Sequence, residues 1–227
     1  AEFERINTEI EEYAIKNTLL VKTEYYYQSL FIFYDFSGAP DKKKILPFLN
    51  KAIAEVNEGY NFTKSPIINY YLKNMQMAYA NLNKNYLRAR SICLELLDVV
   101  RNNKSVCRKQ RIGAVYDNLS RCEFYLGHFE HAAEYAREAQ KNFNLHSGNY
   151  GIALEQEFYA LFAMKEYSQA VEIANNMLTS ASEKELGEFR FSKYNYLLAN
   201  ALFKQQKFHE ALQLLSQNRE IAKDKAG

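Results

Sequence analysis

The sequence is poor in the residues that build turns. Only 3 prolines and 8 glycines occur among its 227 residues, and tryptophan is absent. A protein made of β-strands needs turn residues about every 8–12 positions, and this chain does not supply them. The scarcity disfavours a strand-rich fold and favours long helices joined by short loops.

Cysteine is scarce as well. Cys93, Cys107 and Cys122 are odd in number and share no C-x-x-C spacing. This pattern fits neither a disulfide framework nor a cysteine-based zinc site, and it predicts a reducing, cytoplasmic setting. The chain begins with AEFERINTEI, which lacks the basic and then apolar pattern of a secretion signal.

An excess of charge of one sign and a long apolar run are both missing. The chain has 29 basic and 27 acidic residues, a net charge of +2, whereas a nucleic-acid-binding domain is usually clearly basic. No run of 18 apolar residues occurs, so we expect no transmembrane helix. Nucleic acid and membrane are therefore not the expected partners, and a protein or peptide is.

What the chain does contain is a repeat. Four segments share a pattern in which an aromatic residue is followed three positions later by alanine. They are KNYLRA (84–89), GHFEHA (127–132), KEYSQA (165–170) and QKFHEA (206–211). The alanines recur at intervals of 43, 38 and 41 residues. Four matches at one loose period predict a repeated structural unit.

Apolar residues at helical spacing flank each segment. Around GHFEHA they recur every three or four positions on both sides, which predicts a helix, a two-residue turn and a second helix. The alanine would lie where the two backbones approach most closely, and a larger residue there would be overpacked by about 1–3 kcal/mol. We expect the aromatic residue to fill the gap between the helices.

These signals predict an all-α protein with one domain spanning residues 1–227. Loops rich in Gly, Asn, Ser and Thr are expected at 59–65, 102–105 and 144–148, and SGAP (37–40) breaks the first long helical run. The expected helix pairs are 2–58, 66–102, 106–143, 149–180 and 183–222.

The repeat resembles the tetratricopeptide repeat (TPR) family. The best-matching segment, 113–143, places the family's large and small residues at Tyr116, Leu119, Ser120, Gly127, Phe129, Ala132, Ala136 and Ala139. Segment 192–222 supplies Leu198, Ala199, Phe208 and Ala211. The closing proline is missing, three of the four turns lack glycine, and the period is near 41 rather than the usual 34. The longer period resembles long-helix relatives such as kinesin light chains and the peptide-sensing regulators of Gram-positive bacteria.

The resemblance implies a right-handed α-solenoid of about five antiparallel helix pairs, whose first helices line a concave groove. Projecting the family's pattern onto this chain assigns the groove to Tyr71, Asn74, Asp117, Arg121, Tyr125, Glu155, Tyr159, Lys193, Tyr196 and Asn200. Arg121 and Asn200 occupy positions where some relatives clamp a terminal carboxylate. Asp117 and Glu155 stand where such a clamp would be basic, so an internal peptide segment or a helix is the expected ligand.

Catalytic and metal-binding patterns are weak. No nucleophile elbow, Gly-rich phosphate loop or H-E-x-x-H motif occurs, so we expect no enzyme activity, no catalytic residue and no cofactor. His128 and His131 are three positions apart, but no Glu or Cys joins them at a usable spacing, and no metal site is expected.

Two further features each have two interpretations. The basic run RNNKSVCRKQR (101–111) could bind phosphates or an acidic partner, or could be a solvated loop, which is the favoured interpretation. The 18 tyrosines include Tyr25-Tyr26-Tyr27 and Tyr70-Tyr71, which cannot all face one core because adjacent helical positions diverge by about 100°. Some of these rings should therefore reach a surface or groove, unless they act as wedges between helices.

The leading hypothesis for function is a non-catalytic interaction module that binds a protein or peptide segment in its groove. The alternative is the ligand-sensing or regulatory segment of a larger transcription regulator or signalling protein. Because the chain begins without methionine and would leave Leu212, Leu215 and Ile221 partly uncovered, we expect flanking domains in the native chain. Its richness in Asn and Tyr indicates an AT-rich, bacterial genome.

Overall fold

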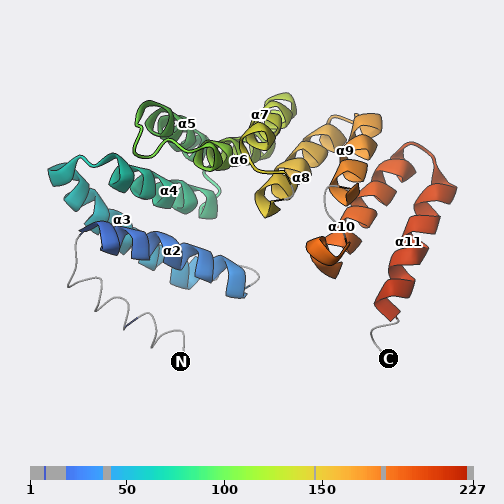
Figure 1. Cartoon of the computed structure of the whole chain (residues 1–227), viewed down its shortest axis with the longest axis horizontal. Coiled ribbons are helices and arrows are strands. Elements are labelled where there is room, and N and C mark those ends of the chain that lie inside the picture. Colours follow the sequence, from blue (N-terminus) through green and yellow to red (C-terminus); the bar gives the residue numbers. More distant parts are fainter. Residues whose placement is uncertain (1–7, 9–18, 38–41, 146, 180–182, 224–227) are drawn as a thin grey trace. The chain divides into compact units, whose positions relative to one another are not determined.

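The computed structural model describes residues 8, 19–37, 42–145, 147–179 and 183–223, which form α-helices and no strand (Figure 1). The predicted all-α class is confirmed. The helices are α2 (Leu19–Ser37), α3 (Lys42–Thr63), α4 (Pro66–Leu82), α5 (Tyr86–Asn102), α6 (Lys109–Leu126), α7 (Phe129–Asn142), α8 (Gly148–Ala163), α9 (Tyr167–Thr179), α10 (Glu183–Lys204) and α11 (Phe208–Lys223). None of the described helices is both long enough and apolar enough to cross a bilayer.

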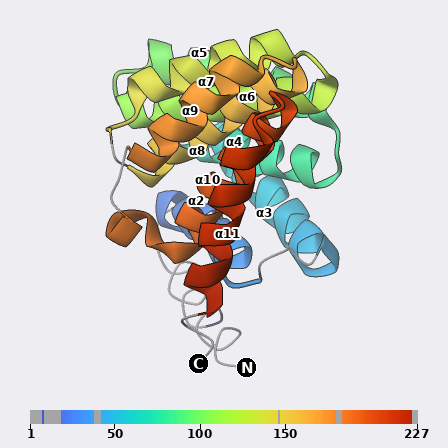
Figure 2. The same cartoon turned by 90° about the vertical axis from the view of Figure 1, so that its right-hand side faces the viewer.

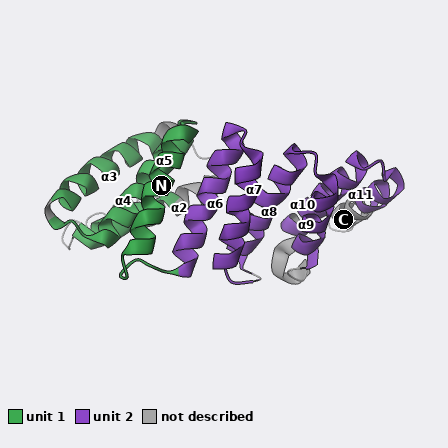
Figure 3. Ribbon diagram, turned by 90° about the horizontal axis from the view of Figure 1, so that it is seen from above, with its two compact units in different colours: residues 1–108 green, residues 109–227 purple. Residues whose placement is uncertain are grey.

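The chain divides into two compact units, residues 1–108 and 109–227 (Figure 3). In the first unit α2 packs against both α3 and α4, α3 packs on α4, and α4 packs on α5. In the second unit each helix from α6 to α11 packs against the next one, and α6 also contacts α8 (Figures 1 and 2). That the whole chain forms a single domain stays a prediction.

Helix bounds within the described residues agree with the expected segments, apart from one loop. The predicted loop at 59–65 is wrong, because α3 continues to Thr63 and only Lys64 and Ser65 separate it from α4. Gly59 has a packing role: a Cβ atom there would lie 2.4 Å from Cδ2 of Leu19 on α2. The expected helical stretch before residue 19 and most of the SGAP break lie outside the described residues.

All four turns of the repeat have the same backbone conformation. The first residue of each motif, Lys84, Gly127, Lys165 or Gln206, has a positive φ of 57°, 84°, 65° and 65° respectively. Its N–H donates to the carbonyl three residues earlier, and the next N–H donates to the carbonyl five residues before it, at 2.9–3.1 Å. This pair of bonds is the Schellman motif that ends many helices. Three of the four turns therefore achieve without glycine a conformation that favours glycine.

The repeated alanines are buried as predicted. Ala89, Ala132, Ala170 and Ala211 are at most 3% exposed, and the N–H of each donates to the carbonyl of the motif's second residue. At Ala132 the carbonyl also accepts a hydrogen bond from Ser120 Oγ at 2.7 Å, which joins α7 to α6. The alanine after each turn is thus buried, and at Ala132 it takes part in a direct contact between the two helices.

The aromatic residue of the motif packs on a ring at the end of the preceding helix. Phe129 contacts Phe124, Tyr167 contacts Phe162, and Phe208 contacts Phe203, with ring centroids 5.3–5.4 Å apart. The two rings of each pair are five residues apart, so they close the turn from one side. We call them the turn ring pairs.

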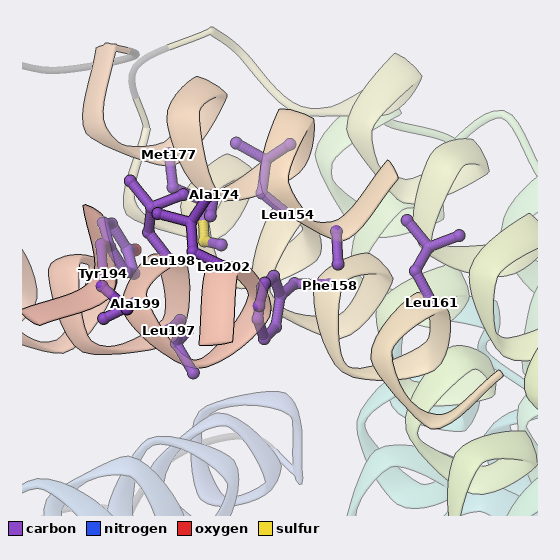
Figure 4. Packing of buried hydrophobic residues seen from close by; sticks show 13 residues of the cluster. Leu154, Phe158, Leu161, Ala174, Met177, Tyr194, Leu197, Leu198, Ala199 and Leu202 are labelled. Atoms are coloured by element: carbon purple, nitrogen blue, oxygen red, sulfur yellow. The ribbon is translucent and has the colours of Figure 1, made fainter. Parts of the chain in front are cut away.

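Each unit has its own hydrophobic core. In the second unit Leu154, Phe158, Met177, Tyr194 and Leu198 belong to a cluster formed by α8 to α11 (Figure 4). In the first unit α2, α3 and α4 form a cluster that includes Tyr26, Ile45, Leu49, Val56 and Met75, each at most 1% exposed.

The five adjacent tyrosines of the first unit fit the interpretation that they act as wedges between helices. Tyr26, Tyr70 and Tyr71 are buried and Tyr25 and Tyr27 are half-buried. Two faces of α2 are covered, because Tyr26 contacts Phe48 of α3 at 5.6 Å while Tyr27 contacts Tyr71 of α4 at 4.9 Å. Adjacent rings that diverge by about 100° can therefore both be buried.

Candidate functional site

A row of charged side chains crosses three helices of the second unit. It begins on α6, where Arg121 Nη2 bonds Asp117 Oδ2 at 3.1 Å, an i,i+4 pair. On the neighbouring α8, Glu155 accepts from Lys193 Nζ of α10 at 2.5 Å. The negative charge of Glu155 also acts on Asp117, which links the two ion pairs. We call Asp117, Arg121, Glu155 and Lys193 the charged row.

Within the charged row, Asp117 is the group whose ionised form is disfavoured by burial. It is 9% exposed, and burial raises the pKa of its carboxyl above the ordinary value of 3.8. The Arg121 guanidinium opposes this shift and Glu155 adds to it. Within the described part of the chain no hydrogen-bond donor reaches Asp117 Oδ1. A buried acceptor without a donor costs free energy, so this oxygen adds to the cost of burying Asp117.

Tyr194 lies beside the charged row. Burial of its hydroxyl, together with the neighbouring Glu155 carboxylate, raises its pKa above the ordinary value of 10. The hydroxyl therefore stays protonated at neutral pH and can act as a donor. Gly151 of α8 lies close by, since a Cβ atom there would be 3.2 Å from this hydroxyl oxygen. Tyr194 could not be predicted as a site residue, because its position within the apolar pattern of α10 indicates a core residue.

Exposed aromatic side chains accompany the charged row. Tyr125, one turn after Arg121 on α6, is 57% exposed, and Tyr196, three residues after Lys193 on α10, is 55% exposed. Tyr159 of α8 is half-buried, with its ring centroid 6.5 Å from that of Phe124, and Asn200 is also half-buried. The structure thus pairs the four predicted charged residues and leaves Tyr125 and Tyr196 exposed on two of the same helices; that all of them line one groove stays a prediction.

The two predicted groove residues of the first unit, Tyr71 and Asn74, are buried and do not line a groove. Tyr71 and Asn74 are each 8% exposed. The Tyr71 ring packs against Tyr27 and Tyr70, and Nδ2 of Asn74 donates to the Tyr70 carbonyl at 2.7 Å. Because α2 covers this face of α4, neither side chain lines an open surface in this structure.

Two buried carboxylates also escaped the sequence analysis. Glu157 is 5% exposed and accepts from Arg137 Nε at 2.6 Å and Gln140 Nε2 at 2.7 Å, which joins α8 to α7. Glu123 is fully buried, and its Oε2 lies 2.7 Å from Nδ1 of His128. Both glutamates occupy positions where the helical pattern calls for an apolar residue, and this mismatch could have indicated that they are buried.

The basic run 101–111 spans the end of α5, the following loop and the start of α6. Arg101, Lys104, Arg108 and Lys109 are exposed, and Arg111 is half-buried. Their exposure suits either interpretation of the run, so the favoured one, a solvated loop, stays a prediction.

Comparison with known proteins gives a likeness in fold. No family model matches the chain, and no curated protein matches its sequence. Among solved structures, the crystal structure of BtubC (BKLC) from P. vanneervenii is similar, with a TM-score of 0.76 over 99% of this chain and 89% of that one. Sequence identity is 13%, so what the two proteins share is the helical fold.

Proposed function

We propose that this chain is a non-catalytic interaction module that binds a segment of another protein along α6, α8 and α10. The observation that carries the proposal is the charged row, which is flanked by the exposed rings of Tyr125 and Tyr196. Tyrosine offers apolar area with a polar tip, and it is enriched in protein interfaces. Paired charges of both signs add orientation and specificity.

The proposal includes an α-solenoid of the TPR type, right-handed and built from about five antiparallel helix pairs. Its support is the identical Schellman turn at four places and the buried alanine that follows each turn. The similarity to BtubC over 99% of the chain is a second support at the level of fold. In such arrays each repeat buries its apolar face against its neighbours, and the first helices of successive repeats form the binding surface.

The chemistry of the charged row favours an internal peptide segment over a terminal carboxylate. Its two acids and two bases balance each other, and the buried Asp117 Oδ1 accepts from no described donor. A terminal carboxylate would meet the negative charges of Asp117 and Glu155 and be repelled. We therefore expect an internal segment of the partner, with no free carboxylate at this point.

A peptide selection tests the proposal. Peptides selected from a random library on the immobilised chain would be titrated against the wild type and the double variant Arg121→Glu/Tyr125→Ala. We expect the double substitution to weaken binding at least about tenfold, a loss of about 1.4 kcal/mol. The double variant must keep the wild-type helicity in circular dichroism.

The matched control is Glu134→Ala, an exposed position of α7 outside the charged row, which should leave the dissociation constant unchanged. Equal affinity of the wild type and the double variant would show that the peptides bind elsewhere and would overturn the assignment of the site. The regulatory alternative stays a prediction, since no described contact favours it over an interaction module.

A further inference from the structure

The hairpin of α6 and α7 differs from the three related hairpins at three positions around its turn. Four residues before the left-handed turn residue, the other hairpins have the buried apolar side chains of Ala80, Leu161 and Leu202. The α6–α7 hairpin has Glu123 there, and its side chain is fully buried. A carboxylate is costly to bury, and the related turns show that this backbone forms without one.

Two histidines stand next to this carboxylate. His128 is the second residue of the turn, and its Nδ1 lies 2.7 Å from Glu123 Oε2. His131, one helical turn further along α7, has its ring centroid 6.2 Å from that of His128. At the corresponding places the other hairpins have Asn85, Glu166 and Lys207, and then Arg88, Gln169 and Glu210. The combination of one acid and two imidazoles is thus confined to one of the four equivalent turns.

The three side chains are close enough to serve one ion. One donor atom from each lies within 4.8 Å of the others. Two ligands of a zinc ion, each about 2.0–2.2 Å from it, lie at most about 4.4 Å apart. The donor atoms would have to move a few tenths of an ångström closer, and rotation of the two exposed histidine side chains can supply this change. The expectation that no carboxylate joins these histidines is therefore wrong: the turn places Glu123, five residues before His128, beside it.

We propose that His128 and His131 bind a divalent transition-metal ion such as Zn²⁺, and that Glu123 positions His128 for it. A carboxylate that accepts from one ring nitrogen directs the other nitrogen toward a metal, an arrangement common among metal-binding histidines. Here the hydrogen bond is at Nδ1, so Nε2 of the exposed ring is the metal ligand. Imidazole ligands select zinc, copper or nickel over calcium or magnesium. Water would complete the coordination of an ion at this exposed turn.

Such an ion would hold the turn residue His128 to the start of α7, and Glu123 would connect this group to the end of α6. A ligand that binds the folded chain and not the unfolded one raises thermal stability in proportion to the logarithm of its concentration. The ion would therefore stabilise the hairpin that contributes Asp117, Arg121 and Tyr125 to the proposed binding surface.

The test uses the full chain without an affinity tag, stripped of metal and titrated with Zn²⁺ in a calorimeter. We expect binding of one ion per chain, a higher Tm with Zn²⁺, and no heat with Ca²⁺, which prefers oxygen ligands. His128→Asn and His131→Gln take their residues from related turns, so that the hairpin still folds, and Glu123→Gln keeps the size of the side chain. His128→Asn and His131→Gln should each abolish the zinc-dependent rise in Tm, while Glu123→Gln should weaken binding by about 10–100-fold. His209→Gln, at an exposed histidine in the first turn of α11, is the control and should change nothing.

Glu123→Leu separates a metal site from an ion pair that serves the fold. If Glu123 is present for the metal, the metal-free Leu variant melts at or above the wild-type temperature and no longer responds to Zn²⁺. A lower Tm of the metal-free variant would assign Glu123 to folding and overturn the proposal. So would a zinc response that persists in the His128→Asn or His131→Gln variants, or the absence of binding to the wild type up to about 1 mM Zn²⁺, a free energy of only about 4 kcal/mol.

Discussion

The two units of the molecule use their charged side chains in opposite ways. In the first unit Lys22 of α2 pairs with Glu55 of α3, and Lys73 of α4 pairs with Glu95 of α5. Burial opposes ionisation of Glu55, but hydrogen bonds from Lys22 and Tyr26 outweigh it and lower its pKa; a hydrogen bond from Lys73 lowers the pKa of Glu95. In the second unit burial raises the pKa of Asp117 despite its pairing with Arg121.

The direction of the pKa shift distinguishes carboxylates that stabilise the packing of helices from a carboxylate that destabilises the fold and is a candidate for ligand binding. A carboxylate whose pKa is lowered gains free energy from its partners in the folded state, whereas one whose pKa is raised loses free energy on folding. A group that costs stability, has an oxygen without a described donor and lies in a row of charges is a candidate for function. By this criterion the proposed binding site belongs to the second unit.

Tyrosine differs between the units in part. Tyr26, Tyr70 and Tyr71 of the first unit are buried, and the second unit has buried tyrosines at Tyr116 and Tyr194 but also Tyr125 and Tyr196, which are more than half exposed. The four Schellman turns are the feature that both units share, with one turn in the first and three in the second.

The largest effect is expected where the units are alike. Ala132→Arg in the second unit and Ala89→Arg in the first should each destabilise the fold by roughly 4–8 kcal/mol, because they combine overpacking with a buried charge. Both alanines are 0% exposed. Thermal unfolding followed by circular dichroism measures the loss, with Glu134→Arg on the exposed side of α7 as the control. A Tm within one degree of the wild type for either alanine variant would show that the repeat alignment is wrong.

A smaller loss should distinguish the tyrosines of the two units. Tyr26→Ala removes a ring that is 1% exposed and a hydrogen bond from its hydroxyl to Glu55 at 2.9 Å, at an expected cost of about 3–5 kcal/mol. Tyr125→Ala removes an exposed ring and should change stability by less than about 0.5 kcal/mol. Urea denaturation of both variants checks the contrast, and similar losses would contradict the division into supporting and binding tyrosines.

Substitutions at the turn residues should change the free energy of unfolding by about 1 kcal/mol, with opposite signs for adding and removing a side chain. Gly127→Ala places a side chain at a φ of +84° and should destabilise by about 1–2 kcal/mol. Lys165→Gly relieves a similar strain at a φ of +65° and should stabilise, by less than about 1 kcal/mol because glycine also gains entropy in the unfolded chain. The corresponding change in the first unit is Lys84→Gly. Opposite signs for Lys84→Gly and Lys165→Gly would mean that the turns differ energetically.

The smallest effects are expected from the carboxylates, and their signs should differ between the units. Because the pKa of Asp117 is raised, its stability cost is absent below about 3.8 and grows as the pH rises through the folded-state pKa. Asp117→Asn should therefore raise the Tm at pH 7 and have little effect near pH 3, although Arg121 loses its partner and offsets part of the gain.

Glu95→Gln should behave in the opposite manner. Its lowered pKa contributes stability that is present above about 4.5 and is lost as the pH falls through the folded-state pKa. The variant should melt below the wild type at pH 7, by less than about 1 kcal/mol for so exposed a pair, and the difference should vanish in acid. Melting curves between pH 3 and pH 8 check both carboxylates, and equal signs at pH 7 would remove the electrostatic contrast between the units.

Most of the helix bounds could be predicted from the sequence, because local patterns determine them. Apolar residues every three or four positions mark the helices, and the motif that ends in alanine marks the turns. The loop at 59–65 was misjudged since Gly59 serves a contact with Leu19 of α2, and nothing in the neighbouring residues signals a contact 40 positions away. The left-handed turns at Lys84, Lys165 and Gln206 are equally hidden, as their side chains carry no preference for that conformation.

The candidate site could be predicted in part. Helical spacing was enough to select Asp117, Arg121, Glu155 and Lys193, which the structure brings into one row. Burial was not predictable, because it depends on which helix covers which face: α2 covers Tyr71, and Asn74 is buried as well. The contact between Glu123 and His128 was missed because residues five apart do not share a helical face; only the turn brings them together.

The turn ring pairs have a practical consequence for spectroscopy. Since the chain contains no tryptophan, replacing Phe129 or Phe208 with tryptophan would give a single fluorophore packed against the end of the preceding helix. Its emission would report whether that one hairpin is closed, apart from the background of 18 tyrosines. The repeated architecture thereby provides a set of equivalent positions from which the opening of individual hairpins can be followed in real time.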